Sequence, residues 1–203
     1  WDEVDSTHLA SGQSTYTFTQ LAAGKYYVDA SPENGTYARA KSAEFTLAEG
    51  QSLPVITVAL VPGATVAGTI TGPGGAALSG VNGISLVAER WDAAADGGSW
   101  VWERSDFLYS GTSYSISNLP AGTYRVVAGP SGGSYITANS AEFSLAEGQT
   151  RSGITIALAA GASVTGSVTG PGGAALDDVD QVTLVAERWI NDGDGGYWDY
   201  END

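Results

Sequence analysis

Apolar and polar residues alternate with a period of two through much of the chain, most clearly between residues 64 and 161. Val66 and Ile70 alternate with Thr65 and Thr69, which is the pattern of a half-buried β-strand. Similar patterns predict further strands near residues 84–91, 100–102, 114–116, 124–128, 135–138, 141–145 and 154–158. Turns rich in glycine and proline separate these strands, and no stretch has helical periodicity. The pattern predicts an all-β fold, arranged as an antiparallel Greek-key β-sandwich.

The same pattern occurs twice, at an offset of 98 residues. Gly72–Leu78 returns as Gly170–Leu176, and Leu86–Trp91 returns as Leu184–Trp189. The correspondence holds without a gap between residues 13 and 203. A period this long is one small domain per repeat rather than one turn of a solenoid. The sequence therefore predicts tandem sandwich domains of about 98 residues.

The 98-residue register divides the chain into one complete repeat and two partial ones. Residues 63–161 form the complete repeat, which we call the central domain. Residues 1–62 correspond to the second half of a repeat and residues 162–203 to the first half. We call these the N-terminal and C-terminal half-repeats. Neither is expected to be stable alone, because two or three strands leave an apolar face and open edges in water.

Three arrangements would complete the half-repeats. The C-terminal half-repeat of one copy pairs with the N-terminal half-repeat of a neighbouring copy, a head-to-tail contact that propagates into a filament. Alternatively, the chain is a window on a longer covalent array, or the two half-repeats meet within one chain. The first two arrangements describe the same object, a string of sandwich domains.

Composition limits the partners of such a chain. Its net charge is −15, with only eight lysines and arginines, which argues against nucleic acid or an anionic membrane surface as a partner. There is no cysteine, and no apolar run approaches the length of a membrane span. These features suit an extracellular or cell-surface protein of a bacterium or archaeon that does without disulfide bonds.

The repeat resembles a known family. The segment Gly68–Leu78, the strand Ile84–Val87 and the corner Ser115–Tyr124, with its Leu-Pro-Ala-Gly-Thr-Tyr sequence, are similar to carboxypeptidase regulatory-like domains. That family has a transthyretin-like, or prealbumin-like, sandwich and is related to the B-type repeats of bacterial adhesins. Several adhesin relatives form an isopeptide bond from a lysine in the first strand. Here the lysines are Lys25 and Lys41, outside that strand, so we expect no such crosslink.

Candidate chemistry is sparse. His8 is the sole histidine and lies outside the repeat pattern, so we expect a surface position and no enzyme activity. The acidic turn at residues 191–196 has the oxygen density of a calcium loop but lacks its closing glutamate. We expect a plain hairpin turn and no cofactor, with weak calcium binding at Asp192 and Asp194 as the alternative.

Aromatic side chains flank the two acidic turns, at Trp91, Trp100, Trp102, Trp189, Trp198 and Tyr200. We expect these rings to pack within a domain or between neighbouring domains. The alternative is that they stack on surface glycans, as in a carbohydrate-binding module. Arg90 and Arg188 are placed to lie over a tryptophan ring. The resulting expectation is a non-enzymatic filament, stalk or adhesin spacer whose partners are copies of itself, with carbohydrate binding as the alternative function.

Overall fold

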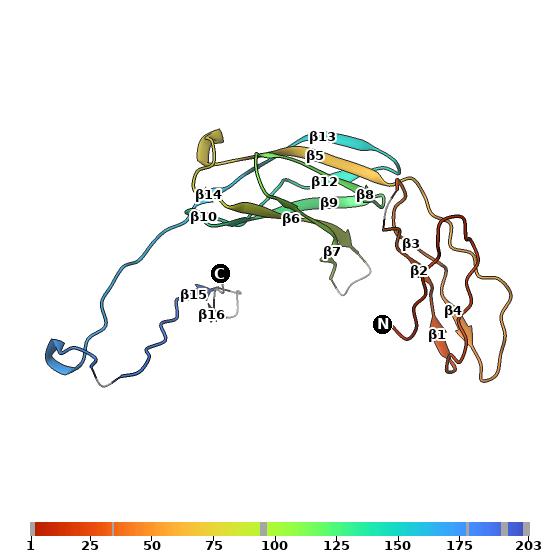
Figure 1. Ribbon diagram of the computed structural model, residues 1–203, viewed down its shortest axis with the longest axis horizontal. Coiled ribbons are helices and arrows are strands. Elements are labelled where there is room, and N and C mark those ends of the chain that lie inside the picture. The colour runs from red at the N-terminus through yellow and green to blue at the C-terminus, as the bar shows by residue number, and fades with distance from the viewer. Residues whose placement is uncertain (1–2, 34, 94–96, 178, 192–194, 201–203) are drawn as a thin grey trace. The chain divides into compact units, whose positions relative to one another are not determined.

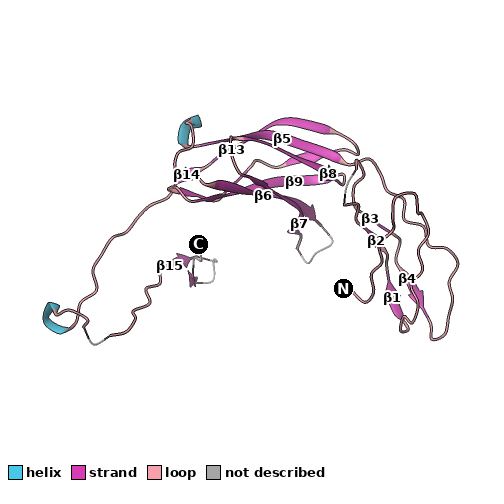
Figure 2. Ribbon diagram, in the orientation of Figure 1, coloured by secondary structure: helices cyan, strands magenta, loops and turns pink. Residues whose placement is uncertain are grey.

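The computed structural model describes residues 3–33, 35–93, 97–177, 179–191 and 195–200. The chain divides into two compact units, residues 1–162 and 163–203. Strands account for the regular structure, and the described helical residues form two short 3₁₀ turns, η1 (Pro73–Gly75) and η2 (Pro171–Gly173) (Figure 2). The predicted all-β class is confirmed.

Two main sheets form the central domain (Figure 1). One sheet has the order β13-β5-β8, formed by β5 (Ala64–Thr71), β8 (Ser113–Leu119) and β13 (Thr150–Ala157). The other has the order β11-β9-β6-β7, with β12 also paired to β9; its strands are β6 (Gly83–Asp92), β7 (Ser99–Leu108), β9 (Gly122–Ser131), β11 (Ala138–Asn139) and β12 (Phe143–Leu145). Two further strands, β10 (Tyr135–Ile136) and β14 (Ala159–Ala160), pair with each other.

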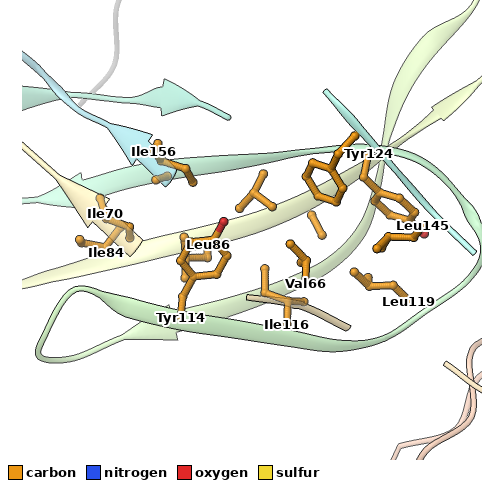
Figure 3. Packing of buried hydrophobic residues seen from close by; sticks show 14 of the residues in the cluster. Val66, Ile70, Ile84, Leu86, Tyr114, Ile116, Leu119, Tyr124, Leu145 and Ile156 are labelled. Carbon is orange, nitrogen blue, oxygen red and sulfur yellow. The ribbon is translucent and has the colours of Figure 1, made fainter. Parts of the chain in front are cut away.

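One hydrophobic core lies between the two sheets and follows from the alternation. Val66 and Ile70 of β5 are buried, and so are Ile84 and Leu86 of β6, while the residues between them are more exposed. Figure 3 shows these side chains meeting those of the second half of the repeat, including Ile116. The buried set is Ala64, Val66, Ile70, Ile84, Leu86, Ala88, Tyr114, Ile116, Leu119, Tyr124, Val126, Ala128, Phe143, Leu145, Ile156 and Leu158. Both halves of the repeat therefore supply the core.

The expectation of a wholly antiparallel domain was wrong for one pair of strands. β13 runs parallel to β5, with Ile154 opposite Gly68 and Ile156 opposite Ile70. Both strands begin at the same end of the sheet, where the Thr65 N–H donates to the carbonyl of Gln149 at 2.8 Å. Alternation in the sequence reports which face a residue occupies and carries no information on strand direction. The direction is set instead by where the connection from β12 returns to the sheet.

Gly68 lies where β5 and β13 approach each other closely. A Cβ atom there would overlap the carbonyl oxygen of Ile154 and lie 2.9 Å from the Tyr114 hydroxyl. That hydroxyl donates to the Ile154 carbonyl at 3.0 Å, so a bond between β8 and β13 passes over the glycine. Glycine within a strand commonly marks such a close approach.

The half-repeats contain short two-stranded pairings. In residues 3–62, β1 (Gly24–Tyr26) pairs with β4 (Phe45–Leu47), and β2 (Asp29–Ala30) pairs with β3 (Ala40–Lys41). In the C-terminal unit, β15 (Glu187–Ile190) pairs with β16 (Tyr197–Tyr200). Three segments of the half-repeats lie within the described residues but form no β-ladder. They are residues 15–21, 52–59 and 163–169, which correspond to β8, β13 and β5 of the central domain. Each of these segments lacks the neighbouring strand that its counterpart has in the central domain.

Replacing Gly68 with alanine is expected to lower the unfolding free energy of the central domain by about 1–3 kcal/mol, the usual cost of overpacking. The methyl group would force β5 away from the Ile154 carbonyl. Urea denaturation followed by tryptophan fluorescence measures the change, with Thr69→Ala on the exposed side of the same strand as the control. Equal stability of Gly68→Ala and wild type would contradict the parallel pairing at this position.

Candidate self-assembly surfaces

The N-terminal half-repeat reproduces the local geometry of the second half of the central domain. The Tyr26 hydroxyl donates to the carbonyl of Ala22 at 2.8 Å, as Tyr124 donates to Pro120 at 2.9 Å. The ring of Tyr26 stacks on Phe45 with centroids 6.1 Å apart, against 6.3 Å for Tyr124 and its partner phenylalanine. These contacts lie within one half of the repeat and form without the other half.

A tyrosine bridges the two unpaired segments of the N-terminal half-repeat. The Tyr16 hydroxyl donates to the Ile56 carbonyl at 2.5 Å, at the positions of Tyr114 and Ile154 in the central domain. Burial raises the pKa of both phenols above their ordinary value, that of Tyr114 to about 12. The bond that spans Gly68 in the complete repeat is thus already made in the half-repeat. We call the Tyr16–Ile56 hydrogen bond the tyrosine bridge.

The C-terminal half-repeat exposes the positions that the central domain buries. Val164 is 92% exposed and corresponds to the buried Val66, while Leu184 is 74% exposed and corresponds to Leu86. Val168 and Val182, the counterparts of Ile70 and Ile84, are also exposed. These four residues form the apolar set of this half-repeat. Apolar surface left in water in this way is a feature of interaction sites.

The N-terminal half-repeat holds the other part of the same core. Its apolar side chains occupy the positions of the second-half core residues, and they are half-buried or exposed where their counterparts are buried. They are Tyr16, Phe18, Leu21, Tyr26, Val28, Phe45, Leu47, Val58 and Leu60. The two half-repeats therefore present complementary parts of one core, and neither presents a part that the other also has.

Charge differs between the two half-repeats. Residues 162–203 contain nine acidic side chains and one arginine, whereas residues 1–62 contain seven acidic side chains and three basic ones. Two C-terminal half-repeats would repel each other more strongly than a C-terminal and an N-terminal one. Charge therefore disfavours contact between two C-terminal half-repeats.

The predicted aromatic residues form one packed pair in each hairpin. Trp91 and Trp100 lie edge to face with centroids 5.3 Å apart and an interplanar angle of 64°, and Trp189 and Trp198 repeat this at 5.3 Å and 68°. Rings tilted by this much do not form a flat platform for a sugar. Both pairs are made between adjacent strands of a single hairpin, so the aromatic contact belongs to the hairpin itself.

In the central domain, Arg125 rather than Arg90 lies over a tryptophan ring. Arg125 of β9 lies 4.7 Å from the centroid of Trp100 and donates to Glu89 at 2.6 Å. Arg90 instead pairs with Glu103 at 3.0 Å, because it lies on the opposite face of β6 from its neighbour Glu89. Sequence spacing alone did not give the strand pairing that places Arg125 beside Glu89.

Trp102 remains the most exposed tryptophan of the central domain, at 58%. It lines a shallow open depression of about 250 Å³ together with Glu103, Arg104, Tyr37 and Arg39. Asp29 holds Arg39 by a two-pronged ion pair, with both N–O distances at 2.7 Å, and thereby raises the pKa of Arg39. The depression is polar and contains two exposed rings, those of Trp102 and Tyr37.

The remaining predicted sites are placed as follows. His8 is exposed. Asp192 and Asp194, the alternative calcium ligands, lie outside the described residues. Tyr200 pairs through its backbone with Glu187. No group of three acidic, histidine or cysteine side chains suited to a metal ion occurs among the residues that the structure describes.

The comparisons with known proteins give little. No known protein family and no curated protein matches the chain. Among solved structures it is similar to a leucine-rich repeat protein from Bacteroides thetaiotaomicron, at 18% sequence identity and a TM-score of 0.29. The similarity covers 59% of this chain and 17% of that one, so the chain spans less than a fifth of that protein's length. In the part of the chain that the structure describes, no helix is long and apolar enough to cross a membrane.

High pH is expected to destabilise the central domain through Tyr114. Its pKa is raised to about 12 in the folded state, so the folded protein holds the phenolic proton more tightly than the unfolded chain does. The stabilisation is complete below about pH 10, the usual tyrosine pKa, and is lost as the pH rises through 12. Thermal unfolding at several pH values measures this loss. Tyr114→Phe should show a shallower fall in melting temperature than wild type over that interval, and an identical fall would contradict the assignment.

Proposed function

We propose that this protein is a structural repeat protein that forms a filament, stalk or adhesin spacer through head-to-tail completion of its half-repeats. One observation carries the proposal: the apolar set of the C-terminal half-repeat and the core positions of the N-terminal half-repeat together correspond to every buried residue of the central domain's core that is larger than alanine. Joining them would bury side chains that are otherwise in water, which is the main driving force of association. The contact is heterologous and propagates along a line of copies.

We propose that each repeat is a transthyretin-like Greek-key sandwich of the carboxypeptidase regulatory-like kind, on the strength of the Leu119–Tyr124 corner and the two-sheet arrangement. In this corner the Tyr124 hydroxyl closes a loop back to Pro120. A domain of this kind needs no cofactor and performs no reaction to act as a spacer, and its acidic surface discourages lateral contact between filaments. Such a role suits the outside of a cell.

Short connections would make the string of domains stiff. The Gly63 N–H donates to the carbonyl of Thr36 at 2.7 Å, and Ala38 donates to Val61 at 2.9 Å. A Cβ at Gly63 would lie 2.5 Å from the Cα atom of Asn118, so the junction between successive repeats is close-packed. Close packing at the junction limits bending between one repeat and the next.

Self-association of the chain tests the proposal. Sedimentation velocity at increasing concentration is expected to show a series of species at multiples of the 20.7 kDa chain, and electron microscopy to show linear particles. Added salt should strengthen association, because it screens repulsion between acidic chains. Monomers at every concentration and ionic strength would contradict head-to-tail completion.

Leu184→Asp is expected to weaken this association by at least about tenfold, since it places a charge where Leu86 is buried in the complete repeat. The side chain is exposed in the unassembled chain, so folding of the central domain should be unchanged. Tyr109→Asp is the control, because Tyr109 is a large, exposed side chain of the central domain outside the proposed contact. Equal effects of the two substitutions would argue against a role of the C-terminal apolar set.

A further inference from the structure

The three-stranded sheet of the central domain depends on a strand from the first half of the repeat. β5 lies between β13 and β8 and pairs with both, parallel to the first and antiparallel to the second. β8 and β13 have no ladder with each other. A second half without β5 therefore has the two outer strands of this sheet and lacks the middle one.

The N-terminal half-repeat has these two outer strand segments and lacks the middle strand. Residues 15–21 and 52–59 correspond to β8 and β13, and the tyrosine bridge connects them at 2.5 Å. In the central domain the equivalent bond passes over Gly68, so the bridge marks where the middle strand crosses. Only a residue without a side chain can pass under it.

The C-terminal half-repeat holds a matching strand. Residues 163–169 correspond to β5, with Gly166 at the position of Gly68. A Cβ at Gly68 would overlap its neighbours, whereas a Cβ at Gly166 would meet no atom within 4 Å. Gly166 has no positive φ angle that would require glycine in its own unit. Glycine is required at position 166 only if the segment is paired with two neighbouring strands, as β5 is in the central domain.

We infer that residues 163–169 of one copy insert as the middle strand between residues 15–21 and 52–59 of a second copy, with Gly166 under the tyrosine bridge. This inference rests on the proposed head-to-tail assembly and names its contact. Val164 and Val168 then occupy the core positions of Val66 and Ile70, against Phe18 and Val58. Main-chain hydrogen bonds on both sides of the inserted strand supply affinity, as in other strand-addition complexes.

A second copy is favoured over closure within one chain by the path through the central domain. The chain enters beside the start of β5, near Gln149, and leaves beyond the end of β13, where the Gly161 N–H donates to the carbonyl of Ser134. β5 and β13 are parallel, so entry and exit lie at opposite ends, about 26 Å apart for eight residues of strand. The two half-repeats are thus attached at opposite ends of one domain.

Cysteine crosslinking tests the contact, since the chain has no cysteine of its own. In the central domain Thr155 lies opposite Thr69, and both are exposed, so the equivalent pair is Thr57 and Ser167. Chains carrying Thr57→Cys alone and Ser167→Cys alone are mixed and oxidised, and each is also oxidised separately. We expect a disulfide-linked dimer in the mixture in clear excess over either separate sample. Adjacent strands bring the Cα atoms within the range that a disulfide requires.

Ser52→Cys mixed with Ser167→Cys is the register control. Ser52 corresponds to Thr150, which lies opposite Thr65 and so four residues from the position of Ser167. That is about 13 Å along the strand, too far for a disulfide. Equal crosslinking of the two mixtures would overturn the parallel register. A disulfide that forms only when Thr57→Cys and Ser167→Cys are in one chain would overturn the assignment to a second copy.

Gly166→Ala supplies an independent test. The methyl group has open space in the separate unit, but under the tyrosine bridge it would clash, so we expect assembly to weaken by about tenfold or more. Ser144→Thr, which adds one methyl group at an exposed position of β12, is the control and should assemble as wild type does. If wild-type chains never assemble, the proposed function itself is wrong. If wild-type chains assemble, two results together would show that only the strand insertion is wrong. These are equal assembly of Gly166→Ala and the absence of a disulfide in the mixture of Thr57→Cys and Ser167→Cys.

Discussion

The position of β5 in the middle of the three-stranded sheet is the constraint on which the rest of the structure depends. The strand belongs to the first half of the repeat, yet both of its neighbours belong to the second half. A sheet of this order cannot form from either half alone, since the outer strands have no ladder to each other. The core has the same property, because its buried residues come from both halves. Division of the repeat at its midpoint therefore separates residues that share one sheet and one core in the central domain.

Contacts made within one half of the repeat are present in the half-repeats, whereas the strand pairings between the two halves are not. The tyrosine corner, the tryptophan pair and the glycine-proline turn are each made within one half, and each occurs in a half-repeat with nearly the geometry of the central domain. Ladders between the halves are missing from residues 15–21, 52–59 and 163–169. A half-repeat thus has its local shape without the other half of the repeat. In the proposed assembly, such preorganisation would lower the conformational entropy lost on association.

The tryptophan hairpins belong with the local contacts. Trp91 packs on Trp100 across one hairpin, and Arg125 joins that hairpin to β9 through Trp100 and Glu89. This arrangement stiffens the outer face of the larger sheet and leaves Trp102 as the most exposed tryptophan of the central domain. The geometry suits packing within the domain better than the stacking of a sugar on parallel rings.

The sequence by itself determined the all-β class, the strand positions and the repeat length, because these follow from local alternation and from identity at a fixed offset. It also placed Trp91 on the face opposite Leu86, since side chains alternate across a strand. The direction of β13 and the choice of Arg125 rather than Arg90 over Trp100 were decided by tertiary structure. In the sequence, Gly68 is recognisable only as a glycine within a strand pattern. Such a glycine can mark a bulge as well as a close approach of another backbone. The tyrosine bridge over it joins residues that lie 40 apart in the chain, and no local pattern encodes which carbonyl a hydroxyl will reach.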